Sequence, residues 1–136
     1  MPKISIILAS ERLDKIYPAI ILATSSVALG WNAEIFFTFW GLLALKKGHE
    51  TKNVSLDYNE YKESLIKMIE LGKIPEWKSM LKSFKNTGRL KIYACSTTMD
   101  LFKINKENLE DFVDDIVGAP TFLSKAKDSE INLFIS

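Results

Sequence analysis

A run of β-branched and aliphatic residues, Lys3 to Ala9, constrains the fold of this chain more than any other feature. A strand with no polar alternation is typical of a parallel sheet whose two faces are both covered by helices. Further strands are predicted at 32–39, 90–95, 112–117 and 131–135. We therefore expect a mainly parallel sheet of five strands.

Helical patterns separate these strands. Residues 13–29 have helical length and precede Gly30, a residue type that commonly ends helices. Apolar residues recur at helical spacing in two later segments: Tyr61, Leu65, Met68 and Ile69, then Trp77, Met80, Leu81 and Phe84. Short helices are expected after Cys95 and from Pro120. The alternation predicts one three-layer, doubly wound α/β domain over residues 1–136.

Two stretches depart from these regular patterns. The helix at 13–29 is apolar almost all round, so it requires cover on two sides, and we expect a partner subunit to supply part of it. Residues 42–59 fit no period: 42–45 are compatible with a helical turn, whereas 48–59 are polar and unpatterned. We predict that this second stretch is a mobile loop.

The charge balance argues against nucleic acid and acidic membranes as partners, because the net charge is only +1. The distribution is uneven, however. Residues 62–91 contain eight bases and three acids, a balance of 8 − 3 = +5, and residues 107–115 contain five acids and no base. These segments are either two solvated faces or, for the basic one, a surface that attracts an anion or an acidic partner.

Cysteine and motif content narrows the chemistry. One cysteine and one histidine exclude an internal disulfide and a Cys/His metal cluster, and a free thiol favours a reducing compartment. We expect the N-terminal segment to be a first strand and not a signal peptide, and the longest apolar stretch, 16–29, is interrupted and too short to span a bilayer. The prediction is a cytoplasmic protein. No dinucleotide, P-loop or CxxC motif occurs, so no cofactor is expected.

Cys95 is the one residue to which a reaction can be assigned. It ends a predicted parallel strand and precedes a helix, where backbone N–H groups favour a thiolate. Ser96, Thr97 and Thr98 add hydroxyl and backbone donors, and Thr97 has capping-box spacing to Asp100. Alternatively, Cys95 is a buried apolar filler.

His49 is the only imidazole that could form a dyad with this cysteine. It lies in the unpatterned 48–59 stretch, which favours a solvated surface residue instead.

Three stretches resemble a known family: FFTFWGLL at 36–43, KIYACSTTMDLFKI at 91–104 and VGAPTFLSK at 117–125. The chain looks like the DsrE/DsrF-like sulfur-transfer proteins, sometimes labelled peroxiredoxin-like. The resemblance covers essentially the whole chain. It implies a flavodoxin-like fold without flavin, homo-oligomers, and a cysteine that exchanges a sulfane or thiosulfonate group with a TusA-like carrier protein.

The resemblance also assigns residues. The reactive cysteine of the family corresponds to Cys95, and Phe39, Trp40 and Gly41 are expected to wall the site. Lys103 replaces a glycine that many relatives have, and the second cysteine of some branches is missing. Any disulfide chemistry would therefore be intermolecular.

Three hypotheses follow for function. In the first, the chain is a sulfur carrier or sulfurtransferase that takes sulfur from a small anion such as thiosulfate and passes it to a partner's cysteine. In the second, it is a non-catalytic, oligomeric interaction subunit with a structural Cys95. In the third, it is a one-cysteine peroxide-reactive protein.

Overall fold

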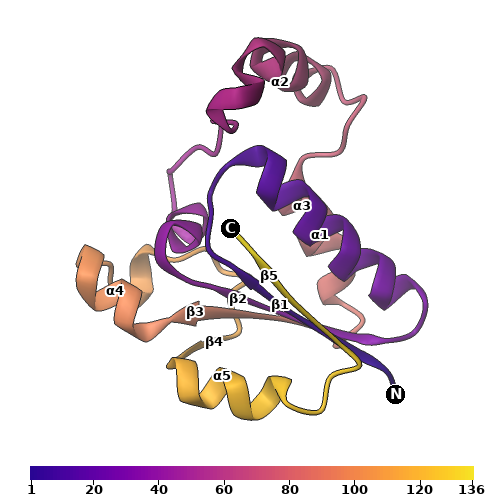
Figure 1. Ribbon diagram of the computed structural model, residues 1–136, viewed down its shortest axis with the longest axis vertical. Helices are drawn as coiled ribbons and strands as arrows, with labels where there is room; N and C mark the ends of the chain where they lie inside the picture. Colours follow the sequence, from indigo (N-terminus) through magenta and orange to yellow (C-terminus); the bar gives the residue numbers. More distant parts are fainter.

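The centre of the protein is a five-stranded, all-parallel sheet with the strand order β4-β3-β2-β1-β5 (Figure 1). A computed structural model describes all residues from 1 to 136. The strands are β1 (Lys3–Leu8), β2 (Asn32–Phe37), β3 (Leu90–Cys95), β4 (Asp115–Val117) and β5 (Ile131–Ile135). The predicted parallel sheet of five strands is confirmed.

Helices cover both faces of the sheet. They are α1 (Leu13–Ala28), α2 (Lys62–Glu70), α3 (Trp77–Lys85), α4 (Ser96–Phe102) and α5 (Ala119–Ala126). Helices α1 and α3 lie on one face, α5 lies on the other, and α2 stands away from the sheet (Figure 1). The three-layer α/β fold is confirmed. None of these helices combines the length and the apolar character needed to cross a membrane.

The main core lies on the α1 face and contains 26 buried residues. The inward residues of α1, such as Ile16, Ile20 and Ala23, are fully buried there. On the opposite side of this helix, the apolar residues Ile21 and Leu22 remain exposed. The sheet and α3 therefore supply most of the cover that α1 requires, and a partner subunit on this helix stays a prediction.

The α5 face has a smaller cluster of six buried residues: Phe36, Tyr93, Cys95, Val117, Phe122 and Ala126. The rings of Phe36 and Phe122 stack with their centroids 4.8 Å apart. This stack fixes α5 over strands β2 and β3. Cys95 thus lies on the thinly covered face of the sheet.

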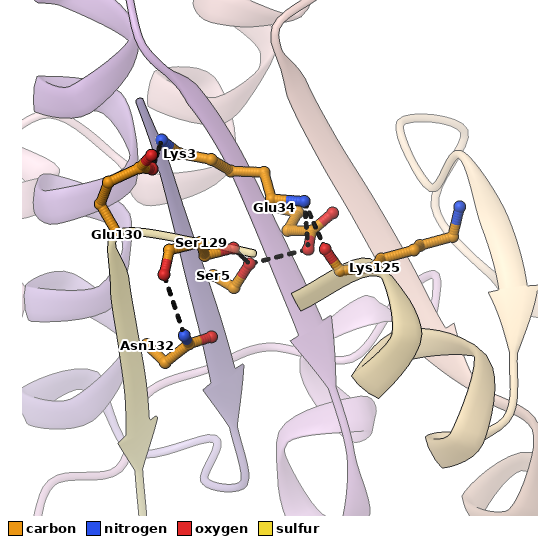
Figure 2. Close-up of polar contacts among 7 residues, drawn as sticks. All are labelled: Lys3, Ser5, Glu34, Lys125, Ser129, Glu130 and Asn132. Carbon is orange, nitrogen blue, oxygen red and sulfur yellow. Dashed lines mark hydrogen bonds and ion pairs between the residues drawn. The ribbon is translucent and has the colours of Figure 1, made fainter. Parts of the chain in front are cut away.

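A polar cluster continues the α5 face toward the amino ends of the strands (Figure 2). Ser5 Oγ donates to Glu34 Oε1 at 2.7 Å and lies 2.6 Å from Ser129 Oγ. Lys3 Nζ lies 3.4 Å from the same Glu34 oxygen. Because Glu34 is only 5% exposed, these contacts offset the cost of burying its side chain.

The helical turn considered at 42–45 is confirmed, whereas the loop predicted at 48–59 is wrong at its carboxyl end. Residues Phe39–Leu45 form a 3₁₀ helix, η1, and Leu56–Tyr61 form a second one, η2. Leu42 and Leu45 are fully buried in the main core. Between the two helices, the carbonyl oxygen of Asn53 accepts from Leu13 N at 2.8 Å. The segment therefore packs against the carboxyl end of the sheet.

Two predicted strands are longer than the observed ones. β2 stops at Phe37 rather than at residue 39, because Phe39 adopts a left-handed backbone with φ 50°. β4 starts at Asp115 rather than at 112, because Phe112 packs into the main core. In both places the sequence has the apolar pattern of a strand, but the residues lie outside the sheet.

The two charged segments partly neutralise each other. Lys78 Nζ lies 3.0 Å from Glu110 Oε2, and Lys85 pairs with Asp114. The Asp114 carboxylate also accepts from Ile92 N at 2.7 Å. The basic and the acidic segment therefore contact each other, and the residues in these ion pairs are not free to attract a charged partner.

Candidate functional site

Cys95 lies at the junction between β3 and α4. It is the last residue of the strand and the N-cap of the helix. Parallel pairing sets Phe37 opposite Ala94, so that Thr38, the next residue after β2, comes beside Cys95. The cysteine is 5% exposed, and no surface cavity is lined by it. The sulfur lies just beneath the surface rather than at the bottom of a pocket.

The pKa of the Cys95 thiol depends on its burial and on its polar neighbours. Burial raises the pKa of the Cys95 thiol, but hydrogen bonds from the side chains of Thr38 and Thr98 and from the backbone N–H groups of Thr98 and Thr97 outweigh it. The net result is a Cys95 pKa below the ordinary thiol value. Since the thiolate is the nucleophilic form, the surroundings favour reaction at this residue.

The start of α4 differs from the predicted capping box. The helix begins at Ser96, so Thr97 and Asp100 lie inside it, and the side chain of the N-cap residue, Cys95, makes no capping hydrogen bond. Thr97 is exposed, whereas Thr98 points inward and is 3% exposed. The capping-box prediction is wrong because the helix starts two residues earlier than an N-cap at Thr97 requires.

A hydrogen bond joins the backbone of Phe39 to the side chain of Thr98. Phe39 N donates to Thr98 Oγ1 at 2.9 Å, and the hydroxyl oxygens of Thr38 and Thr98 are 3.4 Å apart. The chain thus turns sharply after Thr38, and this turn brings η1 to the start of α4. Phe39 therefore lies in the immediate surroundings of Cys95.

An exposed aromatic group adjoins this contact. The rings of Phe39 and Trp40 have centroids 4.7 Å apart, and Trp40 stacks on Phe102 of α4 at 5.5 Å. Phe39 is 44% exposed and Trp40 is 53% exposed. This apolar surface lies next to the cysteine and is open to solvent.

Gly41 and Ser96 face parts of the structure other than Cys95. A Cβ atom on Gly41 would lie 2.2 Å from the carbonyl oxygen of Leu8, so this glycine lets η1 approach β1. Ser96 Oγ would lie 3.6 Å from a Cβ atom on Gly118, at the junction of β4 and α5. Trp40 also lines a separate cleft of about 250 Å3 beside Glu11. Of the residues named from the sequence, Phe39, Thr97 and Thr98 have the closest links to Cys95.

His49 does not form a dyad with Cys95. Its Nε2 atom contacts Glu11 Oε2 instead. The possible Cys/His pair is therefore wrong, and His49 connects the segment before η2 to the end of β1.

Thr38 and Phe102 belong to the site but were not predicted. The signal for Thr38 was available, because neighbouring parallel strands end at one edge of the sheet and Thr38 follows β2. It was hidden by a strand predicted two residues too long. Phe102 has no local signal, since its place is set by the stacking with Trp40.

The fold and the site define a small α/β protein with one free thiol at the carboxyl end of a parallel sheet. Residues 1–71 and 59–134 match the DsrE/DsrF/DrsH-like family. The chain belongs to this family.

Two curated relatives align with this chain over nearly the whole length of both proteins. The chain is 29% identical over 157 aligned residues to "Sulfur carrier protein DsrE2" of Allochromatium vinosum, covering 98% of both chains. It is also 29% identical over 153 residues to "Uncharacterized protein YrkE" of Bacillus subtilis, covering 96% of this chain and 95% of the relative.

A solved structure has the same fold. The protein of unknown function MTH1491 from Methanobacterium thermoautotrophicum superposes with a TM-score of 0.61 and 11% identity, covering 98% of this chain and 99% of the other. At this identity the similarity shows the fold alone, and it supports the flavodoxin-like class.

Proposed function

We propose that this protein is a sulfur carrier in which the Cys95 thiolate accepts a sulfane or thiosulfonate group and passes it to a partner's cysteine. The observation that carries the proposal is the position of the one free thiol, at the junction of β3 and α4 with Thr38 beside it in the neighbouring strand register. The relative named as a sulfur carrier supports the same class of cargo. A TusA-like protein is the partner that the family resemblance implies.

Uptake from thiosulfate requires no oxidant. The Cys95 thiolate attacks the outer sulfur of thiosulfate, a new S–S bond forms, and the old S–S bond breaks with its electron pair leaving on sulfite. With tetrathionate, attack on an inner sulfur leaves a thiosulfonate on Cys95 and releases thiosulfate.

Delivery reverses the roles. A partner thiolate attacks the outer sulfur of the Cys95 persulfide, and the bonding pair returns to Cys95 as the thiolate. Because the chain has no second cysteine, no internal disulfide competes with this transfer.

The neighbouring residues take supporting roles in this proposal. The donors at Thr97 and Thr98 stabilise negative charge on the bound sulfur, and Ser96 is available at the same helix start. Phe39 and Trp40 exclude water from the exposed side and present an apolar contact to the partner. Gly41 acts only by fixing η1 against β1.

Intact mass spectrometry tests the proposal directly. The folded protein is incubated with thiosulfate, tetrathionate or polysulfide, and we expect a reducible adduct on the parent protein and none on Cys95→Ser. An unmodified mass with all three donors would remove the proposal. Transfer is then followed by mixing the loaded protein with a TusA-like carrier and measuring the mass of each.

The burial of Cys95 favours one rival, a non-catalytic interaction subunit with a structural cysteine. This rival predicts that the thiol resists alkylation in the folded state and that Cys95→Ser keeps partner binding. Fast alkylation by a small reagent below the ordinary thiol pKa contradicts it. Peroxide consumption with an external thiol is measured in parallel for the one-cysteine peroxidase alternative.

The setting of this chemistry is part of the proposal. A reduced, unpaired thiol requires a compartment such as the cytoplasm, where glutathione and thioredoxin keep thiols reduced. Homo-oligomer formation is checked by light scattering on the purified protein.

A further inference from the structure

The hydroxyl of Thr98 has one proton and two acceptor positions to distribute. One acceptor position is occupied by the N–H of Phe39 at 2.9 Å. The Thr98 proton therefore points away from Phe39, toward Thr38 or toward the sulfur of Cys95. Because Thr98 is 3% exposed, solvent does not compete for this proton.

The hydroxyls of Thr38 and Thr98 are not committed to each other. Their oxygens are 3.4 Å apart, whereas O–H···O hydrogen bonds usually span about 2.5–3.0 Å. Thr38 follows β2 at the register position beside Cys95, and Thr98 lies in the first turn of α4, of which Cys95 is the N-cap. Each therefore has a proton free to donate to a sulfur anion.

The backbone holds Thr38 in place from two sides. Thr38 N donates to the carbonyl oxygen of Leu8 at 3.0 Å, and the Thr38 carbonyl accepts from Gly41 N at 2.9 Å. The side chain of Thr38 thus leaves a fixed backbone, as donors to a reactive centre must.

Phe39 has a conformation that bulky residues rarely adopt. Its φ of 50° lies in the left-handed region, which costs roughly 1–2 kcal/mol for a residue with a Cβ atom. An edge-to-face contact of its ring with Trp40 accompanies this backbone and helps to offset the cost. The result of the turn is that the N–H of Phe39 points at Thr98.

We propose that Phe39 and Thr98 act as positioning residues: the Phe39 N–H orients the Thr98 hydroxyl so that Thr98 and Thr38 together donate to the Cys95 sulfur anion. The inference deepens the proposed function and rests on it for its purpose. In this proposal the left-handed turn at Phe39 serves to orient a donor to the thiol, and not to form the exposed aromatic surface.

The test is the pH dependence of Cys95 alkylation by iodoacetamide in the folded protein. Thr98→Val removes the hydroxyl, and we expect its titration midpoint to move upward and its rate near neutral pH to fall about tenfold. Thr98→Ser keeps the hydroxyl and should keep the midpoint of the parent. A folded Thr98→Val protein with the parent midpoint would overturn the inference.

Two further variants guard against misfolding as the cause. Thr24→Val is the matched control, because Thr24 is also buried but bonds only within α1, to Ile20 O at 2.8 Å and Ile21 O at 3.3 Å. It should leave the midpoint unchanged. Should Thr98→Val not fold, as judged by circular dichroism, Thr38→Val replaces it, and an unchanged midpoint there also overturns the inference.

The ring and the N–H of Phe39 are separated by Phe39→Gly. Glycine keeps the N–H and adopts a positive φ without strain, so the midpoint should stay near that of the parent. A midpoint that moves as far as in Thr98→Val would show that the ring, not the N–H, acts on the thiol, and would overturn this part of the inference.

Sulfur loading is measured separately from these titrations. If Thr98→Val shifts the midpoint but the parent takes no sulfur from thiosulfate, the inference stands and the proposed function fails. If the parent takes sulfur but the midpoint does not move in Thr98→Val, the function stands and the inference fails.

Discussion

The two faces of the sheet differ in how deeply they are covered. The α1 face has a core of 26 buried residues with two helices over it, whereas the α5 face has six under one short helix and a polar cluster around Glu34. Cys95 belongs to the second face. Most of the buried apolar residues thus lie on one side of the sheet, and the candidate thiol lies on the other.

The largest difference should appear when one aromatic residue is removed from each face. Phe37→Ala empties a fully buried site on the α1 face, and we expect a loss of about 3–5 kcal/mol in the free energy of unfolding. Phe122→Ala should cost less, because α5 can settle onto the smaller cluster.

Urea unfolding measures both losses, and alkylation of Cys95 measures access. Only Phe122→Ala should speed alkylation, since Phe122 and Cys95 share a cluster. Equal losses and equal alkylation rates would remove the contrast between the faces.

Gly41→Ala tests the connection between the faces, because η1 starts at Phe39 beside the site and ends in the main core. A Cβ atom would lie 2.2 Å from a backbone oxygen, so we expect a loss of about 1–3 kcal/mol from overpacking. The displaced η1 should also raise the titration midpoint of Cys95.

Gly118→Ala is the matched control for this substitution. Its Cβ would meet only side-chain atoms at 3.6 Å, and its φ of −85° suits any residue. A wild-type midpoint in a destabilised Gly41→Ala protein would show that the site is independent of the η1–β1 contact.

Glu34→Gln tests whether the polar cluster stabilises the α5 face. Glutamine keeps the acceptor for Ser5 but loses the attraction to Lys3, so we expect a loss of about 1 kcal/mol in urea unfolding. A double-mutant cycle with Lys3→Met separates the pair from its surroundings. A coupling energy of zero would mean that the ion pair contributes nothing.

The smallest effect should come from Asp14 on the α1 face. Burial raises the pKa of Asp14, but hydrogen bonds from the Ser55 hydroxyl and N–H, at 2.6 and 2.8 Å, outweigh it and leave the pKa lowered. A lowered folded pKa gives stability above the unfolded value, about 3.9, that is lost as the pH falls through the folded value.

Asp14→Asn should therefore flatten the decline of stability in acid without changing the titration of Cys95. Urea unfolding at several values below pH 5 measures this decline. A parent and a variant with parallel acid limbs would exclude Asp14 as a contributor.

The regular elements were predictable because their apolar patterns are unbroken. Residues 90–95 and 131–135 form strands with the predicted bounds, and 13–28 form the predicted helix. The 3₁₀ helices were not predictable in this way, because their short turns give neither the strand nor the α-helical period. Phe39 and residues 112–113 consequently resembled parts of strands, whereas residues 42–45 were recognisable only as a possible helical turn.

The site was only half predictable for a similar reason. Cys95 and Thr98 are close in sequence, and their pattern placed them at the end of a strand. Thr38 and Phe39 come from another strand, and their approach depends on where β2 stops and on a left-handed turn. The pairing of Lys78 with Glu110 likewise requires the sheet topology, since 32 residues separate them in the chain.

The position of β1 has a consequence for the time course of folding. This strand pairs with β2 on one side and with β5 on the other, so Ile4 meets both Ala33 and Ile131. Pairings across such long separations raise the contact order, which slows folding. During synthesis the β3–α4 junction, which contains the thiol, is made before β5, so one edge of β1 is still unpaired at that stage. Chaperone protection of that open edge would matter most in this interval.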